Sequence, residues 1–126
     1  MFPAVRPICL PEPGEDYDNV TALVTGWGRN TSAGPQSNIL EEAAVTTLTN
    51  RQCRASTHRH DKITENMICT GAAGSGGPLA VLGQDGSYRQ IGVFSWGREN
   101  YPGVYTRLTA LLPWLTYTIS APGSGC

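Results

Sequence analysis

The sequence has no long hydrophobic run and almost no net charge. Its 126 residues carry nine basic and ten acidic side chains, a formal net charge of −1. This excludes the basic footprint of a nucleic-acid-binding domain. No apolar stretch approaches the roughly 20 residues that a membrane-spanning helix needs, and residues 1–7 lack a signal-peptide pattern. We therefore expect neither nucleic acid nor a membrane as a partner of this chain.

Histidine and cysteine are also scarce, which narrows the chemistry. The two histidines, His58 and His60, stand beside Asp61 in a polar stretch. The His-x-His spacing allows a metal site, but exposed loop histidines are the favoured interpretation. The cysteines at 9, 53, 69 and 126 allow three full pairings but no paired C-x-x-C zinc knuckles. We expect no metal and no cofactor.

Short strand-like segments separated by turn residues are what the sequence does contain. They predict strands over 20–25, 40–48, 67–69, 78–82, 88–96 and 103–108. Thr49 and Gln52 form a capping-box pattern, which predicts a short helix over about 50–56. Leucines at helical spacing predict a last helix over about 109–119. This order of elements favours an antiparallel barrel. The expected core residues are Trp27, Val45, Leu79, Ile91, Val93, Val104 and Leu112.

One serine, Ser75, is surrounded by glycine at 74, 76 and 77. Glycines around a serine suit a sharp turn that needs positive φ and leaves the hydroxyl uncrowded. Such a serine can be a nucleophile if a base lies within hydrogen-bond reach. Taken alone, the tetrapeptide favours an ordinary loop that contains Gly and Ser, because a short motif needs its context.

The context is a set of motifs in a fixed order along the chain. They are Pro7-Ile8-Cys9-Leu10-Pro11, Thr25-Gly26-Trp27-Gly28, Met67-Ile68-Cys69, Ser75-Gly76-Gly77-Pro78-Leu79, Ser95-Trp96-Gly97 and Pro102-Gly103-Val104-Tyr105-Thr106-Arg107. With these motifs the chain resembles the trypsin/chymotrypsin family of serine proteases over about residues 5–119, and only its second half. The resemblance implies an all-β fold: a single antiparallel six-stranded barrel, like the second of the family's two barrels, with a C-terminal helix. Residues 1–18 would be an extended interdomain segment, 19–120 the barrel and helix, and 121–126 a tail.

The resemblance also implies a site. Ser75 takes the place of the nucleophile, and Ala73, Gly74 and Ser75 form the oxyanion-hole region. Ser95, Trp96, Gly97 and Gly103 would bind substrate. The sequence departs from the family's Gly-Asp-Ser-Gly-Gly-Pro pattern, because Gly74 replaces the aspartate and Ala73 replaces an oxyanion glycine. Loss of one oxyanion donor costs ~10²–10³ in rate. The segment between Gly71 and Ser75 is also shorter than in the family and lacks the pocket floor.

The family's general base and its orienting aspartate lie in the first barrel, which these residues do not include. A substitute triad of Ser75, His60 and Asp61 is disfavoured, because adjacent His and Asp side chains cannot easily act as base and supporter. We predict a truncated trypsin-like serine endopeptidase domain that is inactive as an isolated chain. The alternative is a non-catalytic homologue that binds a peptide or protein.

The cysteines complete the comparison with the family. The resemblance implies a Cys53–Cys69 disulfide, which would close a loop of roughly 17 residues worth about 3 kcal/mol. Cys9 matches a cysteine that ties the domain to an upstream chain, while a Cys9–Cys126 bridge stays open as an alternative. Another disulfide of the family is missing here, because Ala22 and Val81 stand where the family has its two cysteines.

The expected partners are a peptide or protein substrate or inhibitor, the missing N-terminal barrel, and an upstream chain through Cys9. Two sequons, at Asn19 and Asn30, would accept N-glycans in an exported protein. Together with the cysteines, they indicate an extracellular location for the parent protein.

Overall fold

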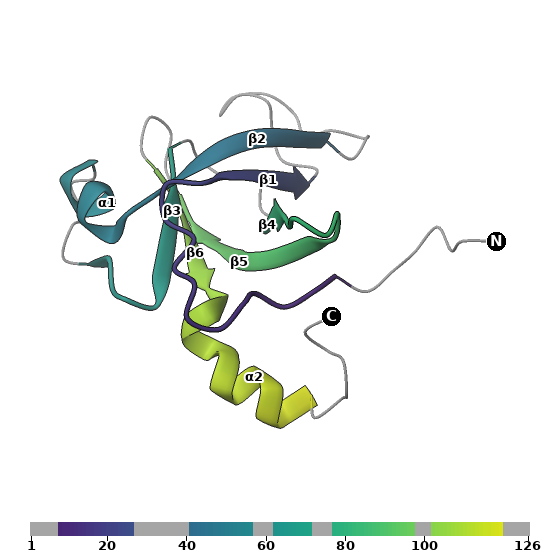
Figure 1. Cartoon of the computed structure of the whole chain (residues 1–126). Coiled ribbons are helices and arrows are strands. Elements are labelled where there is room, and N and C mark those ends of the chain that lie inside the picture. The colour runs from purple at the N-terminus through teal and green to yellow at the C-terminus, as the bar shows by residue number, and fades with distance from the viewer. Residues whose placement is uncertain (1–7, 27–40, 57–61, 72–76, 98–101, 120–126) are drawn as a thin grey trace.

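The fold is a closed barrel followed by a helix. The structure is a computed structural model that describes residues 8–26, 41–56, 62–71, 77–97 and 102–119. Six strands close in the order β1-β2-β3-β6-β5-β4, and every neighbouring pair is antiparallel (Figure 1). The elements are β1 (Thr21–Gly26), β2 (Glu41–Leu48), α1 (Asn50–Ser56), β3 (Met67–Thr70), β4 (Pro78–Leu82), β5 (Tyr88–Trp96), β6 (Gly103–Arg107), η2 (Leu108–Leu111) and α2 (Leu112–Ile119). The predicted all-β barrel with a C-terminal helix is confirmed.

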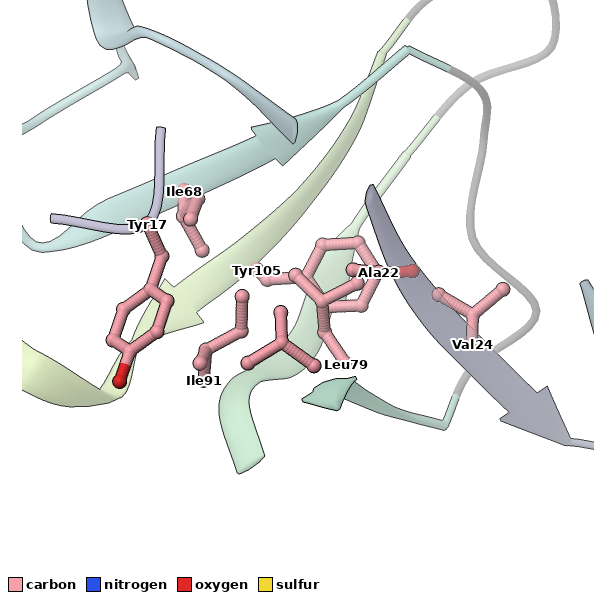
Figure 2. Packing of buried hydrophobic residues seen from close by; sticks show 8 residues of the cluster. Tyr17, Ala22, Val24, Ile68, Leu79, Ile91 and Tyr105 are labelled. Carbon is pink, nitrogen blue, oxygen red and sulfur yellow. The ribbon is translucent and has the colours of Figure 1, made fainter. Parts of the chain in front are cut away.

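The barrel is filled by one apolar cluster contributed by most of its strands. Its members converge in the barrel interior (Figure 2); they are Tyr17, Ala22, Val24, Ile68, Leu79, Val81, Ile91 and Tyr105. A second cluster beside α1 contains Cys53, Ile63, Cys69 and Val104. Of the predicted core residues, Leu79, Ile91, Val104 and Leu112 are buried, and Val45 is half-buried against the main cluster. Trp27 lies outside the described residues.

The prediction that Val93 belongs to the core is wrong. Its side chain is 45% exposed, whereas Ile91 and Gly92 are buried. The strand pairing explains the error, because Leu79 is opposite Gly92 while Ala80 is opposite Gln90, which leaves Ile91 as an extra residue in β5. A bulge of this kind shifts the alternation of a strand by one position. Val93 therefore turns outward, and Phe94 packs against the core instead.

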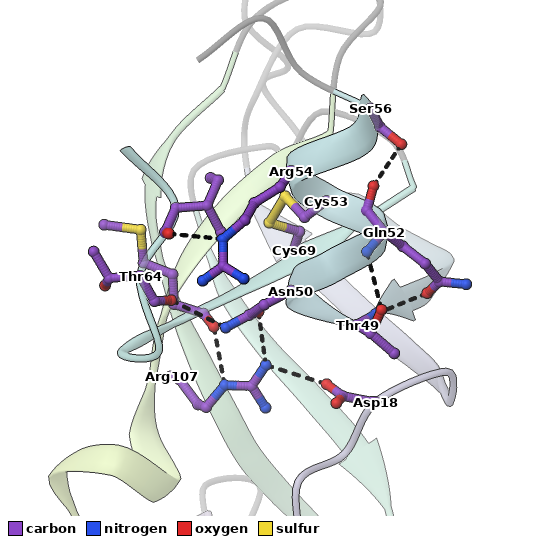
Figure 3. Close-up of a disulfide and its surroundings, with 12 residues drawn as sticks. Asp18, Thr49, Asn50, Gln52, Cys53, Arg54, Ser56, Thr64, Cys69 and Arg107 are labelled. Atoms are coloured by element: carbon purple, nitrogen blue, oxygen red, sulfur yellow. Dashed lines mark hydrogen bonds and ion pairs between the residues drawn. A yellow bond between two sulfur atoms is a disulfide. The ribbon is translucent and has the colours of Figure 1, made fainter. Parts of the chain in front are cut away.

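The short helix α1 begins and is anchored as predicted. The Thr49 hydroxyl accepts a hydrogen bond from the Gln52 N–H at 3.0 Å, and the Gln52 side-chain oxygen accepts one from the Thr49 N–H at 2.8 Å. This reciprocal pair is a capping box. Cys53 of α1 forms a disulfide with Cys69 of β3, with a Cα–Cα distance of 6.1 Å (Figure 3). Both predictions are confirmed, and α1 is fixed covalently to the barrel wall.

The α-helical part of the C-terminal helix starts about one turn later than predicted. Residues 108–111 form a 3-10 turn, η2, and the α-helix proper begins at Leu112. Leu108 and Leu112 are buried, as their spacing indicates. Pro113 occupies the second position of α2, where its fixed φ suits the start of a helix. Beyond this turn, α2 points away from the barrel (Figure 1).

A nearly buried arginine, Arg107 at the end of β6, ties four segments together. Its guanidinium donates to the Asp18 carboxylate at 3.1 Å and to the Asn50 side-chain oxygen at 3.1 Å (Figure 3). It also donates to the backbone oxygens of Met67 and Asp16. Only 10% of its side chain is exposed. The planar fork of arginine suits such multiple donation. Arg107 thus holds the segment before β1 and the start of α1 against the barrel.

Candidate active site

The predicted nucleophile and the oxyanion-hole region, residues 73–75, lie outside the described residues, but both flanks of this segment are defined. Before it, the Gly71 N–H donates to the Thr46 oxygen at 2.9 Å. After it, Gly77 packs directly on the backbone of β1: a Cβ at this position would lie 1.7 Å from the Thr25 oxygen. No side chain fits there. Gly77 is therefore required because two backbones meet, and not for positive φ.

The pairing of the strands explains how distant residues gather around this segment. The chain leaves β3 after Thr70 and enters β4 at Pro78, and these two strands stand on opposite sides of the closed barrel in strand order. Thr70 is the register partner of Gly103, the first residue of β6. Since neighbouring strands are antiparallel, the ends of β3 and β5 and the starts of β4 and β6 share one end of the barrel.

The predicted substrate-binding residues lie at this same end. Trp96, the last residue of β5, pairs with Val104 next to Gly103. A Cβ on Gly97 would lie 3.7 Å from the Gly103 Cα and 3.5 Å from the Phe94 ring. Ser95 and Gly97 are exposed, whereas Trp96 is half-buried against the second core cluster. The structure therefore brings Ser95, Trp96, Gly97 and Gly103 together beside the frame of the serine segment.

A buried tyrosine, Tyr105, lies beneath this end of the barrel, and its burial was not predicted from the sequence. It is fully buried on β6, and its ring meets Phe94 edge to face with 5.5 Å between centroids. No well-formed hydrogen bond reaches its hydroxyl within the described part of the chain. Burial raises the pKa of Tyr105 to about 12, and the Thr70 side chain opposes part of this rise. The apolar surroundings therefore keep this phenol neutral.

The histidines His58 and His60 lie outside the described residues, as does Asp61. The flanks of their segment are tied to α1, because Arg54 donates to the Ile63 oxygen at 3.2 Å and Asn50 donates to the Thr64 oxygen at 3.0 Å (Figure 3). This segment enters the start of β3, whereas the serine segment leaves its end. The two segments are thus attached to opposite ends of one strand, and nothing described brings them together.

Within the described ranges, no group of three or more His, Cys, Asp or Glu side chains could hold a metal ion. None of the helices in that part of the chain is long and apolar enough to cross a membrane. Cys9 is buried, and no cysteine among the described residues is a free thiol. Cys126 lies outside them. Asn19 is exposed at a turn before β1, and Asn30 is not described.

Comparison with known proteins connects this arrangement to a family. A sequence model described as "Trypsin" matches residues 1–115. The chain is 35% identical over 129 residues to "Serine proteinase stubble" of Drosophila melanogaster, covering 90% of this chain and 16% of that protein. It is 36% identical over 128 residues to "Transmembrane protease serine 9" of Rattus norvegicus, covering 91% and 12%. Identity to "Clotting factor G beta subunit" of Tachypleus tridentatus is 34% over 134 residues, covering 88% and 43%. The chain thus spans less than half the length of these relatives.

Proposed function

Because the chain belongs to the trypsin family, we propose that its 126 residues are the second barrel of a trypsin-like serine endopeptidase domain and do not hydrolyse peptides as an isolated chain. Ser75 occupies the position of the nucleophile. One observation carries the proposal. The two residues that flank the serine segment (residues 72–76), Gly71 and Gly77, lie with Gly97 and Gly103 at one end of a single barrel.

The proposed chemistry in the complete domain is acyl transfer at Ser75. The serine oxygen attacks the peptide carbonyl while a base takes its proton; the C–N bond then breaks, and the amine leaves with that proton. Water, deprotonated by the same base, attacks the acyl-enzyme ester, which releases the carboxylic acid and returns the proton to the serine oxygen. Without a base the hydroxyl is a poor nucleophile. The chain's two histidines belong to a segment whose flanks are bound to α1, at the other end of β3 from the serine segment. This attachment supports inactivity of the isolated chain.

Two substitutions next to the serine further support inactivity. Ala73 and Gly74 stand where the family has an oxyanion glycine and the aspartate that sets the oxyanion hole on activation. Oxyanion donors act only when they are held at the position of the developing charge, and loss of one costs about 10²–10³ in rate. A first barrel supplied by the rest of the polypeptide, or by a second chain, would restore the base but not this geometry.

The proposed substrate is an extended peptide lying along Ser95, Trp96 and Gly97. Ser95 and Gly97 are exposed, and the exposed end of a strand suits pairing with a peptide main chain. A Cβ on Gly97 would lie 3.5 Å from the Phe94 ring, so the glycine leaves this side of the ring uncovered. The same features support the alternative function, a non-catalytic module that holds a peptide or protein inhibitor without cutting it.

The proposed partner is the family's first barrel. Trp114 and Tyr117 on α2 are 62% and 83% exposed, which is unusual for large apolar side chains on a helix of a small domain. The helix α2 extends away from the barrel (Figure 1). Exposed aromatic side chains on such a helix support a contact with a neighbouring domain. An extracellular setting is supported by the disulfide between Cys53 and Cys69.

A fluorophosphonate probe tests the proposal, because it labels only activated serine nucleophiles. We expect no labelling of Ser75 in the isolated chain, with an active trypsin-family enzyme as the positive control. Rapid labelling that is lost in Ser75→Ala would contradict inactivity.

Addition of a first barrel as a separate chain is the second arm. Binding that weakens in Trp114→Ala, without labelling, is expected. Full labelling on complementation would show that Ala73 and Gly74 form a competent oxyanion hole. Tight binding of an extended peptide by the isolated chain, weakened at Gly97→Val but unaffected at Ser75→Ala, would favour the binding module.

A further inference from the structure

We propose that Asn19 carries an N-linked glycan, attached at a turn that the fold holds rigid and leaves accessible. The inference shares with the proposed function only the requirement that the chain enters the secretory pathway. A lipid-diphosphate-linked oligosaccharide is the co-substrate. The Asn19 Nδ2 forms a bond to the anomeric carbon as that carbon's bond to the diphosphate oxygen breaks; the lipid diphosphate leaves with the electron pair, and an amide proton passes to a base of the transferring enzyme.

The acceptor side chain is free for this reaction. Asn19 and Thr21, the first and third residues of the sequon, are both exposed. No hydrogen bond within the described ranges uses the Asn19 side chain. Its φ of 55° is a left-handed conformation that asparagine tolerates better than most residues. The left-handed backbone at this position therefore favours asparagine, while its side-chain amide makes no hydrogen bond within the described residues.

The backbone on both sides of Asn19 is fixed, so a glycan here would not disturb the barrel. The buried Thr47 hydroxyl donates to the Tyr17 oxygen at 2.7 Å and accepts from the Val20 N–H at 2.9 Å. Next to Asn19, Asp18 is bound to Arg107 (Figure 3). The turn is thus held by two buried residues, Thr47 and Arg107, while Asn19 alone turns to solvent.

The position of Asn19 keeps a glycan away from the serine segment. Asn19 precedes the start of β1, whereas Gly77 meets β1 at Thr25, near its other end. Thr21 and Thr25 are four positions apart along the strand, which corresponds to about 13 Å. The following residues, Val20 and Thr21, line a surface hollow of about 620 Å³ that also includes Leu82, which is 60% exposed. The first sugars would stand beside this hollow, whose lining is partly polar and partly apolar, and leave the substrate end open.

The test directs the full chain into the secretory pathway of cultured cells and measures occupancy of Asn19. Peptide-N-glycosidase in ¹⁸O water converts each glycosylated asparagine to labelled aspartate, which peptide mass spectrometry quantifies; cell lysates are included so that retained protein is counted. Thr21→Ser keeps the sequon, and Thr21→Val removes it while keeping a β-branched residue in the strand. Asn30→Gln removes the other sequon.

We expect Asn19 to be occupied in the original chain, in Thr21→Ser and in Asn30→Gln, and its occupancy to fall at least about tenfold in Thr21→Val. Equal circular dichroism of the two Thr21 variants shows that folding is not the cause. An unmodified Asn19 peptide from chain that has entered the pathway overturns the inference. Fluorophosphonate labelling of Ser75 does not depend on the occupancy of Asn19. The proposed function and the glycan are therefore tested separately.

Discussion

The two sides of the barrel are held together by different means. On the β3 side, the Cys53–Cys69 disulfide, the capping box of α1 and the four-way donation of Arg107 fix the wall through directional bonds. On the β1–β4 side, Ala22 and Val81 pack in the apolar core, and Gly77 meets the β1 backbone without a side chain between them. The serine segment joins one side to the other. Its two ends therefore depend on two unlike kinds of interaction.

This contrast shows where a family fold tolerates change. Where the family has a bridge between the strands of Ala22 and Val81, this chain fills the same position with two buried apolar side chains, 2% and 8% exposed. Losing both cysteines leaves no orphan thiol, and both replacements belong to the main core cluster. A backbone contact such as that of Gly77 has no such substitute, because every other residue adds a Cβ.

The most damaging change on the β1–β4 side should be Gly77→Ala. Its Cβ would lie 1.7 Å from the Thr25 oxygen, so β1 or β4 must move. We expect a loss of about 4 kcal/mol or failure to fold. The matched control is Gly71→Ala at the other flank, where the nearest atom is the Thr46 oxygen at 3.8 Å. Urea unfolding of the control should change by less than about 0.5 kcal/mol. Equal losses of unfolding free energy in Gly77→Ala and Gly71→Ala would contradict the proposed difference between the two flanks.

A covalent bond can be added to the side that lacks one. The register pairs Leu23 with Ala80 and Val24 with Leu79, so Ala22 and Val81 are opposite one another. Ala22→Cys with Val81→Cys should form a disulfide and raise the free energy of unfolding by about 4 kcal/mol in the chain-entropy model. Thermal unfolding with and without reductant measures the gain. A double variant that keeps two free thiols under oxidising conditions would show that the strands lie differently.

Removing the natural disulfide tests the other side. Cys53→Ala with Cys69→Ala should lower the free energy of unfolding by about 3 kcal/mol, because the unfolded chain regains the entropy of the open loop. The two cavities left in the second core cluster add to the loss. Denaturant midpoints under oxidising conditions provide the measurement. A loss as large as that of Gly77→Ala would mean that the covalent side is the more critical one.

The smallest effect is expected at Tyr105 and only at high pH. Burial raises its pKa from 10 to about 12, so the neutral phenol stabilises the fold fully below pH 10, and this contribution is lost as the pH rises through 12. A rise of this size corresponds to a contribution on the order of 2–3 kcal/mol. Tyr105→Phe should therefore match the original chain within about 1 kcal/mol at pH 7 and unfold less readily than it between pH 10 and 12. Parallel pH profiles of the two proteins would contradict the burial of a neutral phenol.

The barrel, the capping box and the Cys53–Cys69 bridge were predictable because each leaves a local pattern or a family motif in the sequence. Val93 was misplaced because the bulge at Ile91 exists only once β5 pairs with β4. The closeness of Gly77 to Thr25 and the burial of Tyr105 arise likewise from strands far apart in the chain. Of the candidate site, the sequence indicated the residues around Ser75 and Gly97. That Gly71 and Gly77, which flank the serine segment, lie at the same end of the barrel as Gly97 follows only from the strand order.

The bonds of Arg107 also bear on how fast the chain folds and unfolds. They join residues that are 40, 57, 89 and 91 positions apart in sequence. Contacts of such separation form late, since the intervening chain must first be ordered. Interactions absent from the transition state slow unfolding without speeding folding. Arg107 would thus set the lifetime of the folded barrel, and with it the time for which the chain resists proteolysis once made.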